Sequence, residues 1–89
     1  MDRHVVLART RGYVTEAFLY MRPDFVLTDD DSLFERGVID SMGVLELIGF
    51  LHSEFGVTVA DEDINDGNLG TLAGIARYVV ARCGNGAAA

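Results

Sequence analysis

One serine in this chain stands where its hydroxyl group could take part in chemistry. Ser41 follows Asp40 and a short apolar stretch at residues 37–39, and it precedes a strongly apolar run with helical spacing. This pattern places a hydroxyl at the first turn of a helix, on a surface corner, with a carboxylate beside it. Asp-Ser before a helix most often forms an N-cap, in which one side-chain oxygen accepts a hydrogen bond from a free backbone N–H. The surrounding residues decide whether Ser41 does more than cap.

The chain offers this serine no general base and no metal. His4 and His52 fall in different predicted helices, so neither completes a Ser/His/Asp set, and neither has a partner at metal-ligand spacing. The acidic run at residues 61–67 invites comparison with a calcium loop. Its sixth position, however, is Asp66 where glycine is required, and its twelfth is Leu72 where glutamate is required. We therefore expect no catalytic residue and no metal site.

Composition predicts one small, acidic domain. The 89 residues carry a net charge of −7, and twelve of the fourteen acids fall between residues 24 and 66, against the single base Arg36. An acidic face repels phosphates, which argues against binding nucleic acid or anionic lipid. It suits docking on basic patches of partner proteins, although acids also simply keep a small domain soluble. With no signal peptide, no membrane span and one free cysteine, Cys83, we expect a cytoplasmic protein.

The hydrophobic spacing predicts an all-α fold, a small bundle of three main helices plus one short helix with a long first loop. Residues 1–83 form the domain and residues 84–89 a flexible tail. The expected elements are a helix over residues 2–21, a packed loop over 23–40 with a helical turn near 32–35, a helix over 41–55 ended by Gly56, an extended connector over 57–59, one short helical turn from 61 ended at Gly67, and a last helix capped by Thr71. The expected core comprises Val6, Tyr13, Val14, Ala17, Phe18 and Met21 in the first helix, Val44, Leu47, Ile48, Leu51 and Phe55 in the second, and Leu72, Ile75, Ala76, Val79 and Val80 in the last.

The second helix is apolar on more than one side. Met42, Leu45 and Gly49 lie off the core stripe, in a row beside Glu46 and next to Ser41. Full burial of a helix is hard to achieve in a domain of this size, so we interpret this row as a surface that docks partner proteins. The alternative is that Met42 and Leu45 pack beneath the long loop.

The stretch from residue 31 to residue 55 resembles the acyl and peptidyl carrier protein family. The likeness is carried by Ser32-Leu33-Phe34, by Gly37-Val38-Ile39-Asp40-Ser41-Met42 and by Leu45-Glu46-Leu47-Ile48; it continues through residues 54–57 and, more weakly, through 61–64 and 71–76. The resemblance implies a monomeric four-helix carrier without catalytic activity of its own. It implies that Ser41 bears a covalent 4′-phosphopantetheine, flanked by Asp40, whose thiol holds an acyl or aminoacyl group as a thioester. The implied partners are a phosphopantetheinyl transferase, a loading ligase and downstream acyl-processing or condensing enzymes.

The details favour a discrete carrier of a small biosynthetic or aminoacyl-transfer pathway. Carriers of fatty acid synthesis usually have an acid soon after the serine, where this chain has Gly43, and the residues before Asp40 do not match peptide assembly-line domains. Asp40-Ser41-Met42-Gly43 is more similar to D-alanyl carriers and other free-standing carriers. The competing hypothesis is an unmodified acidic helical adaptor that binds a partner protein through the same apolar row. A calcium-sensing function is a third hypothesis, and the loop spacing argues against it.

Overall fold

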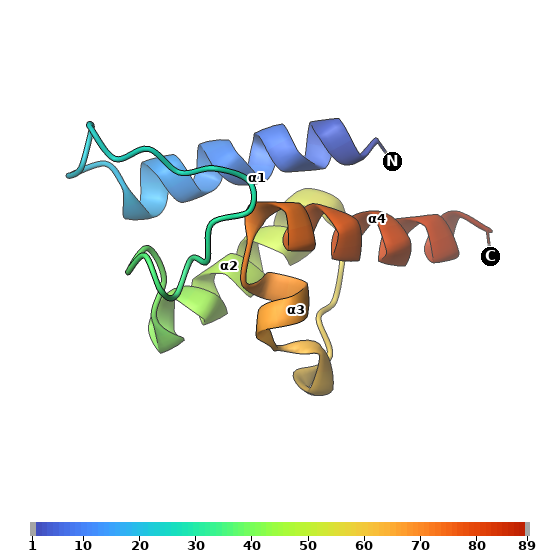
Figure 1. Ribbon diagram of the computed structural model, residues 1–89. Helices are drawn as coiled ribbons and strands as arrows, with labels where there is room; N and C mark the ends of the chain where they lie inside the picture. Colours follow the sequence, from blue (N-terminus) through green and yellow to red (C-terminus); the bar gives the residue numbers. More distant parts are fainter. Residues whose placement is uncertain (1, 89) are drawn as a thin grey trace.

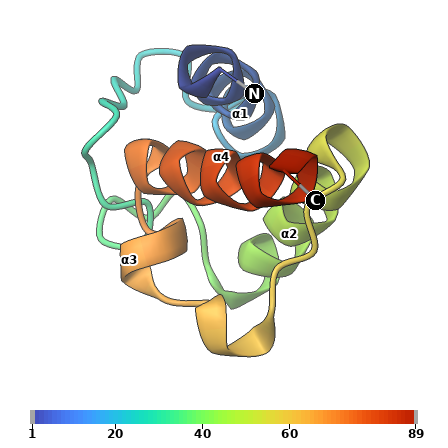
Figure 2. The same ribbon diagram turned by 90° about the vertical axis from the view of Figure 1, so that its right-hand side faces the viewer.

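The computed structural model describes the backbone of residues 2–88 and the side chains through residue 83. It confirms the all-α class: the described residues contain helices and turns and no strand. The elements are α1 (Arg3–Phe18), α2 (Ser41–Phe55), the 3₁₀ turn η1 (Asp61–Asp63), α3 (Asp66–Leu69) and α4 (Leu72–Ala88). Helix α4 lies in the middle, antiparallel to α1 on one side, with α2 and α3 on the other (Figures 1 and 2). The start of α2 lies at the end of the bundle away from both chain termini (Figure 1).

A single hydrophobic core holds these helices together. The inner stripe of α2 is buried at Val44, Leu47, Leu51 and Phe55 as predicted, while Ile48 is half-buried. The stripe of α4 is fully buried at its predicted positions, apart from the half-buried Val80. The connector after α2 buries two valines, as expected. The buried apolar residues outside α2 and α4 are Val6, Val14, Leu19, Leu27, Leu33, Val38, Ile39, Val57, Val59 and Leu69.

Helix α1 begins as predicted but ends earlier. The Asp2 side chain caps it by accepting a hydrogen bond from the His4 N–H at 2.8 Å. The predicted end at Met21 is wrong, because the helix stops at Phe18 and Leu19 turns into the core as the C-cap residue. Met21 is consequently 76% exposed rather than buried. Thr10, which the prediction left out, occupies a fully buried position on the α1 stripe instead.

The loop before α2 and the acidic segment after it are more structured than predicted. Residues 32–36 form the expected helical turn, with the Arg36 N–H donating to the Ser32 carbonyl at 3.0 Å. The acidic run at residues 29–31 is not simply solvated, because two of its members, Asp29 and Asp31, form ion pairs with arginines. The single turn predicted after residue 61 is two turns, η1 and α3, and Gly67 lies inside α3 instead of ending the segment.

The last helix starts where predicted. The Thr71 hydroxyl accepts a hydrogen bond from the Gly74 N–H at 2.9 Å, which satisfies a free donor of the first turn of α4. Helix α4 extends to Ala88 in the backbone. The division into a domain over residues 1–83 and a flexible tail over 84–89 stays a prediction, since the side chains of the tail lie outside the described residues.

Two glycines should respond in opposite directions to replacement by alanine. Gly56 ends α2 with φ of +69°, a conformation that costs an alanine about 1–2 kcal/mol. Gly12 lies inside α1 with open space where a Cβ would be, so Gly12→Ala should stabilise the protein by about 1 kcal/mol. Urea unfolding of the two variants beside the parent protein measures both changes. A Gly56→Ala variant as stable as Gly12→Ala would contradict the observed end of α2.

Candidate functional site

Asp40 caps α2 and leaves the Ser41 hydroxyl free. The Asp40 Oδ1 accepts from the Gly43 N–H at 2.9 Å, and its carbonyl accepts from the Val44 N–H at 3.0 Å. Ser41 is exposed at the first position of the helix, and within the described residues its hydroxyl makes no hydrogen bond. The backbone N–H groups of Ser41 and Met42 also have no acceptor there. The corner therefore presents a free hydroxyl beside two free donors and the positive end of the helix dipole.

The segment that precedes Ser41 is held in place by backbone hydrogen bonds to the buried residue Leu33. The Leu33 carbonyl accepts from the N–H groups of Val38 at 2.8 Å and Ile39 at 3.2 Å, and both of these side chains are buried. The Leu33 N–H donates to the Gly70 carbonyl at 2.8 Å, which links the loop to the junction between α3 and α4. The two residues that precede Asp40 are thus held against the bundle, and the position of Ser41 follows from them.

Gly43 shapes the first turn of α2 in a way that the sequence alone did not reveal. A Cβ at this position would lie 3.2 Å from Phe18 Cε1 and 3.2 Å from Ile39 Cγ2. The absence of a side chain therefore lets the end of α1 pack directly against the start of α2. An acidic side chain at position 43 would meet this contact, so a glycine suits the packing here.

The row of residues predicted to face partners lies on the surface. Met42 is 70% exposed and Leu45 62% exposed, and Glu46 and Gly49 are exposed as well. The alternative, that Met42 and Leu45 pack beneath the long loop, is wrong, because both side chains are exposed. We name Met42, Leu45, Glu46 and Gly49 the α2 face. Its exposure makes it available to a partner, and its binding function stays a prediction.

Phe50 belongs to the contact between α1 and α2 and not to the α2 face. Its ring stacks on Tyr13, with 4.1 Å between centroids and 9° between planes. Burial, and to a lesser extent the nearby carboxylate of Glu46, raises the pKa of the Tyr13 hydroxyl. Tyr13 is therefore a neutral neighbour of the α2 face at physiological pH.

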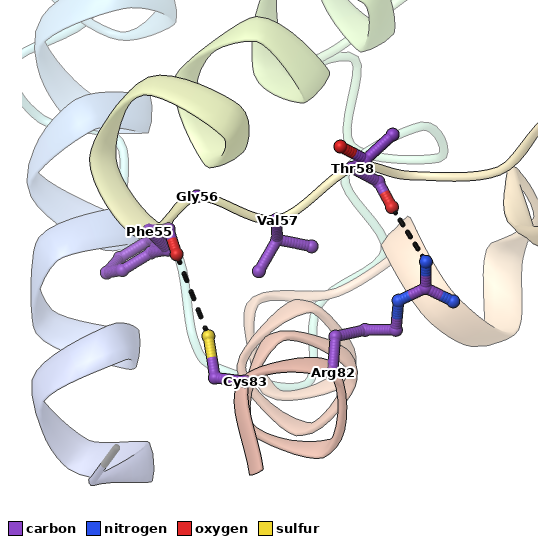
Figure 3. Close-up of a pocket in the computed structure, with 6 residues that line it drawn as sticks. All are labelled: Phe55, Gly56, Val57, Thr58, Arg82 and Cys83. Atoms are coloured by element: carbon purple, nitrogen blue, oxygen red, sulfur yellow. Dashed lines mark hydrogen bonds between the residues drawn. The ribbon is translucent and has the colours of Figure 1, made fainter. Parts of the chain in front are cut away.

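Two of the surface pockets that α2 helps to line lie near its two ends. One, of about 280 Å³, is lined mainly by apolar groups of the first loop, α2 and α3: Phe34, Val44, Ile64, Asn65, Asp66 and Leu69. The other, of about 370 Å³, lies at the far end of α2 (Figure 3). There Arg82 donates to the Thr58 carbonyl at 3.0 Å and the Cys83 thiol lies 3.7 Å from the Phe55 carbonyl (Figure 3). Cys83 is a free thiol that closes the end of α2, remote from Ser41.

The described residues also bear on metal binding and on membrane insertion. No group of three or more His, Cys, Asp or Glu side chains there could hold a metal ion. No helix there is long and apolar enough to cross a membrane.

The described residues thus present a free serine hydroxyl at the start of a helix, on a small helical bundle. The sequence matches the family described as the phosphopantetheine attachment site over residues 16–79, which is most of the chain. The protein therefore belongs to the phosphopantetheine-binding carrier family, and its cofactor is 4′-phosphopantetheine, which is attached covalently to a serine.

A curated relative lies within this class. A D-alanyl carrier protein of Streptococcus suis is 57% identical to this chain over 30 residues, which cover 34% of this chain and 38% of the relative. The match thus spans less than half of the relative's length.

The corner fits the phosphodiester that such an attachment creates. Ser41 is open to solvent, and the free N–H groups of Ser41 and Met42 are donors for an anion at a helix N-terminus. The Asp40 carboxylate is turned toward Gly43, so its cap leaves these two donors available. The residues present are therefore suited to hold the phosphate of the cofactor.

Asp40 should support the corner through its cap and not through its charge. Asp40→Ala should destabilise the protein by about 1 kcal/mol, because the Gly43 N–H loses its acceptor. Asp40→Asn keeps an oxygen in the same place and should remain within about 0.5 kcal/mol of the parent. Urea unfolding compares the two, and equal losses in both variants would contradict the capping function.

Proposed function

We propose that this protein is a discrete acyl or aminoacyl carrier that bears 4′-phosphopantetheine on Ser41. The observation that supports this most strongly is the capping arrangement. Asp40 satisfies the Gly43 N–H, so the Ser41 hydroxyl is exposed and makes no hydrogen bond within the described residues. The other two serines fit less well. Ser32 accepts a hydrogen bond from the Glu35 N–H, and Ser53 lies near the C-terminal end of α2, where the helix dipole disfavours an anion.

The protein's own residues bind and present, and another enzyme supplies the chemistry of attachment. No histidine lies near Ser41 in sequence, since His4 is in the first turn of α1 and His52 in the last turn of α2. The serine therefore depends on a transferase for activation. Once bound, the cofactor supplies a thiol that holds the carried group as a thioester. The free N–H groups of Ser41 and Met42 stabilise the phosphate charge next to the helix.

The α2 face is the surface on which partners dock in this proposal. Its exposed apolar pair, Met42 and Leu45, lies beside the acid Glu46 and one turn from Ser41. A transferase, a loading ligase and downstream enzymes must all reach that serine, so a shared surface beside it serves each of them. The acidic charge of the chain suits basic partners, because charge complementarity raises association rates and selects the partner. The carrier acts as a cytoplasmic monomer in this proposal.

The carried group is an aminoacyl or small acyl group in this proposal. Two observations support it: the similarity to a D-alanyl carrier protein over 30 residues, and Gly43 in place of the acid typical of fatty acid carriers. D-alanine is accordingly the first amino acid to test with a loading ligase. The alternative, an unmodified adaptor that uses the α2 face, does not account for the match to the phosphopantetheine attachment family.

Modification should depend on Ser41 and on no other serine. Incubation with coenzyme A and a broad-specificity phosphopantetheinyl transferase should add one phosphopantetheine to the parent protein, measured by intact mass. Ser41→Ala should abolish the gain, whereas Ser53→Ala, at an exposed serine on the same helix, should keep it. An active transferase that leaves the parent protein unchanged would favour the adaptor.

A positive charge on the α2 face should slow attachment without unfolding the protein. Leu45→Arg should raise the transferase KM about tenfold or more, because an exposed apolar contact is replaced by a charge that repels a basic partner. Val5→Arg changes an exposed apolar residue of α1 and is the matched control. Both variants should retain the helical circular dichroism of the parent. Equal rates for Leu45→Arg and Val5→Arg would count against the α2 face.

A further inference from the structure

An aromatic ring in the first loop holds two arginines at once. The guanidinium carbon of Arg22 lies 4.4 Å from the centroid of the Phe25 ring, and that of Arg36 lies 4.5 Å from the same centroid. Arg22 follows α1, whereas Arg36 directly precedes the turn that leads to Ser41. The ring therefore joins the two ends of a long loop that contains no helix. Each guanidinium is attracted to the negative face of the ring.

Each arginine of this stack also binds another part of the first loop. Arg22 donates to the Gly37 carbonyl at 3.4 Å, and Gly37 turns the chain with φ of +71°. Arg36 forms an ion pair with Asp31 at 2.8 Å, and the Thr28 N–H donates to the same carboxylate at 2.9 Å. The hydrogen bond from Thr28, aided by the charge of Arg36, holds the pKa of Asp31 below its ordinary value, so this partner stays ionised.

We propose that Phe25 is a positioning residue for the modification of Ser41, because its ring holds Arg22, which donates to the Gly37 carbonyl, and Arg36, which directly precedes Gly37. This inference rests on the proposed attachment to Ser41. Phe25 itself touches neither the serine nor, in this account, the transferase. It acts through Arg22 and Arg36. These surface contacts add to the backbone hydrogen bonds that Leu33 forms on the buried side of the same segment.

The physical need for the ring comes from the repulsion between the two arginines that it holds. Two like charges that approach the same ring lie within about one Debye length of each other, so they repel. Asp31 offsets Arg36, whereas the described residues show no carboxylate paired with Arg22. Without the ring, the Arg22 side chain can move out into solvent, and its long hydrogen bond to the Gly37 carbonyl is then lost. The turn before Ser41 then samples other conformations.

Loss of the Phe25 ring should change the KM of the transferase and leave its kcat unchanged. A transferase that binds the ordered corner meets a smaller competent fraction of the carrier, so its KM for the carrier rises while kcat is retained. Loss of one or two cation–π contacts corresponds to an increase of about three- to tenfold. Phe25→Leu removes the ring and keeps an apolar side chain, whereas Phe25→Tyr keeps the ring and should behave as the parent protein does.

The experiment measures KM and kcat for phosphopantetheinylation of the full chain, together with amide hydrogen exchange at residues 37–39. The exchange readout needs no modification of the protein. We expect Phe25→Leu to raise KM about three- to tenfold, to keep kcat within about twofold and to speed exchange at these amides. Arg22→Gln should act in the same direction and carries the test if Phe25→Leu fails to fold. Arg77→Gln, at an exposed arginine of α4, is the control.

Several outcomes would contradict the positioning role of Phe25. A Phe25→Leu variant with unchanged KM and exchange overturns the inference, as does a Phe25→Tyr variant that fails in the same way. Faster exchange throughout the core would show general destabilisation and would also overturn it. If the wild-type protein is never modified, the proposed function itself fails. If it is modified normally while Phe25→Leu is unaffected, the function stands and only the positioning role of Phe25 is contradicted.

Discussion

The position of Ser41 depends on one buried residue that lies eight positions earlier in the chain. Leu33 is fully buried, its N–H donates to the Gly70 carbonyl, and its carbonyl accepts from Val38 and Ile39. These bonds tie the first loop to the junction of α3 and α4 at the point where the loop must deliver a serine to the surface. A loop without regular structure loses much conformational entropy when it is ordered, and a buried anchor with three backbone hydrogen bonds offsets that loss. These three hydrogen bonds hold the segment before Ser41 against the core from the inner side of the loop.

At the start of α2, Asp40, Ser41 and Gly43 have separate structural roles. Asp40 satisfies the Gly43 N–H, Ser41 stays free, and Gly43 admits the end of α1 against the first turn of α2. The helix can therefore be buried on one side and keep the apolar α2 face in solvent on the other. A small domain cannot bury all of its apolar surface, and Met42 and Leu45 are the part of the exposed remainder that lies beside the serine. The same limitation of size leaves these two apolar side chains available to the proposed docking surface.

The sequence predicted the features that depend on local pattern. The start of α2 at Ser41, its end at Gly56, its core stripe and the caps at Asp2 and Thr71 follow from spacing and capping chemistry, and all are present. What it did not reveal depends on tertiary contacts. Helix α1 ends at Phe18 because Leu19 packs inward, whereas the pattern placed Met21 in the core. The packing of Gly43 against Phe18 and the stack of Arg22 and Arg36 on Phe25 join residues that are distant in sequence, so no local spacing indicates them.

The central claim is that Ser41 itself carries the cofactor, and fragmentation of the modified protein tests it most directly. Cleavage after arginine gives a peptide over residues 37–77 that contains Ser41 and Ser53, while Ser32 falls in another peptide. Tandem mass spectrometry of the holo-protein should place one phosphopantetheine on Ser41, in fragments that end before Ser53. A modification found on Ser53 or Ser32, with Ser41 unmodified, would contradict the account.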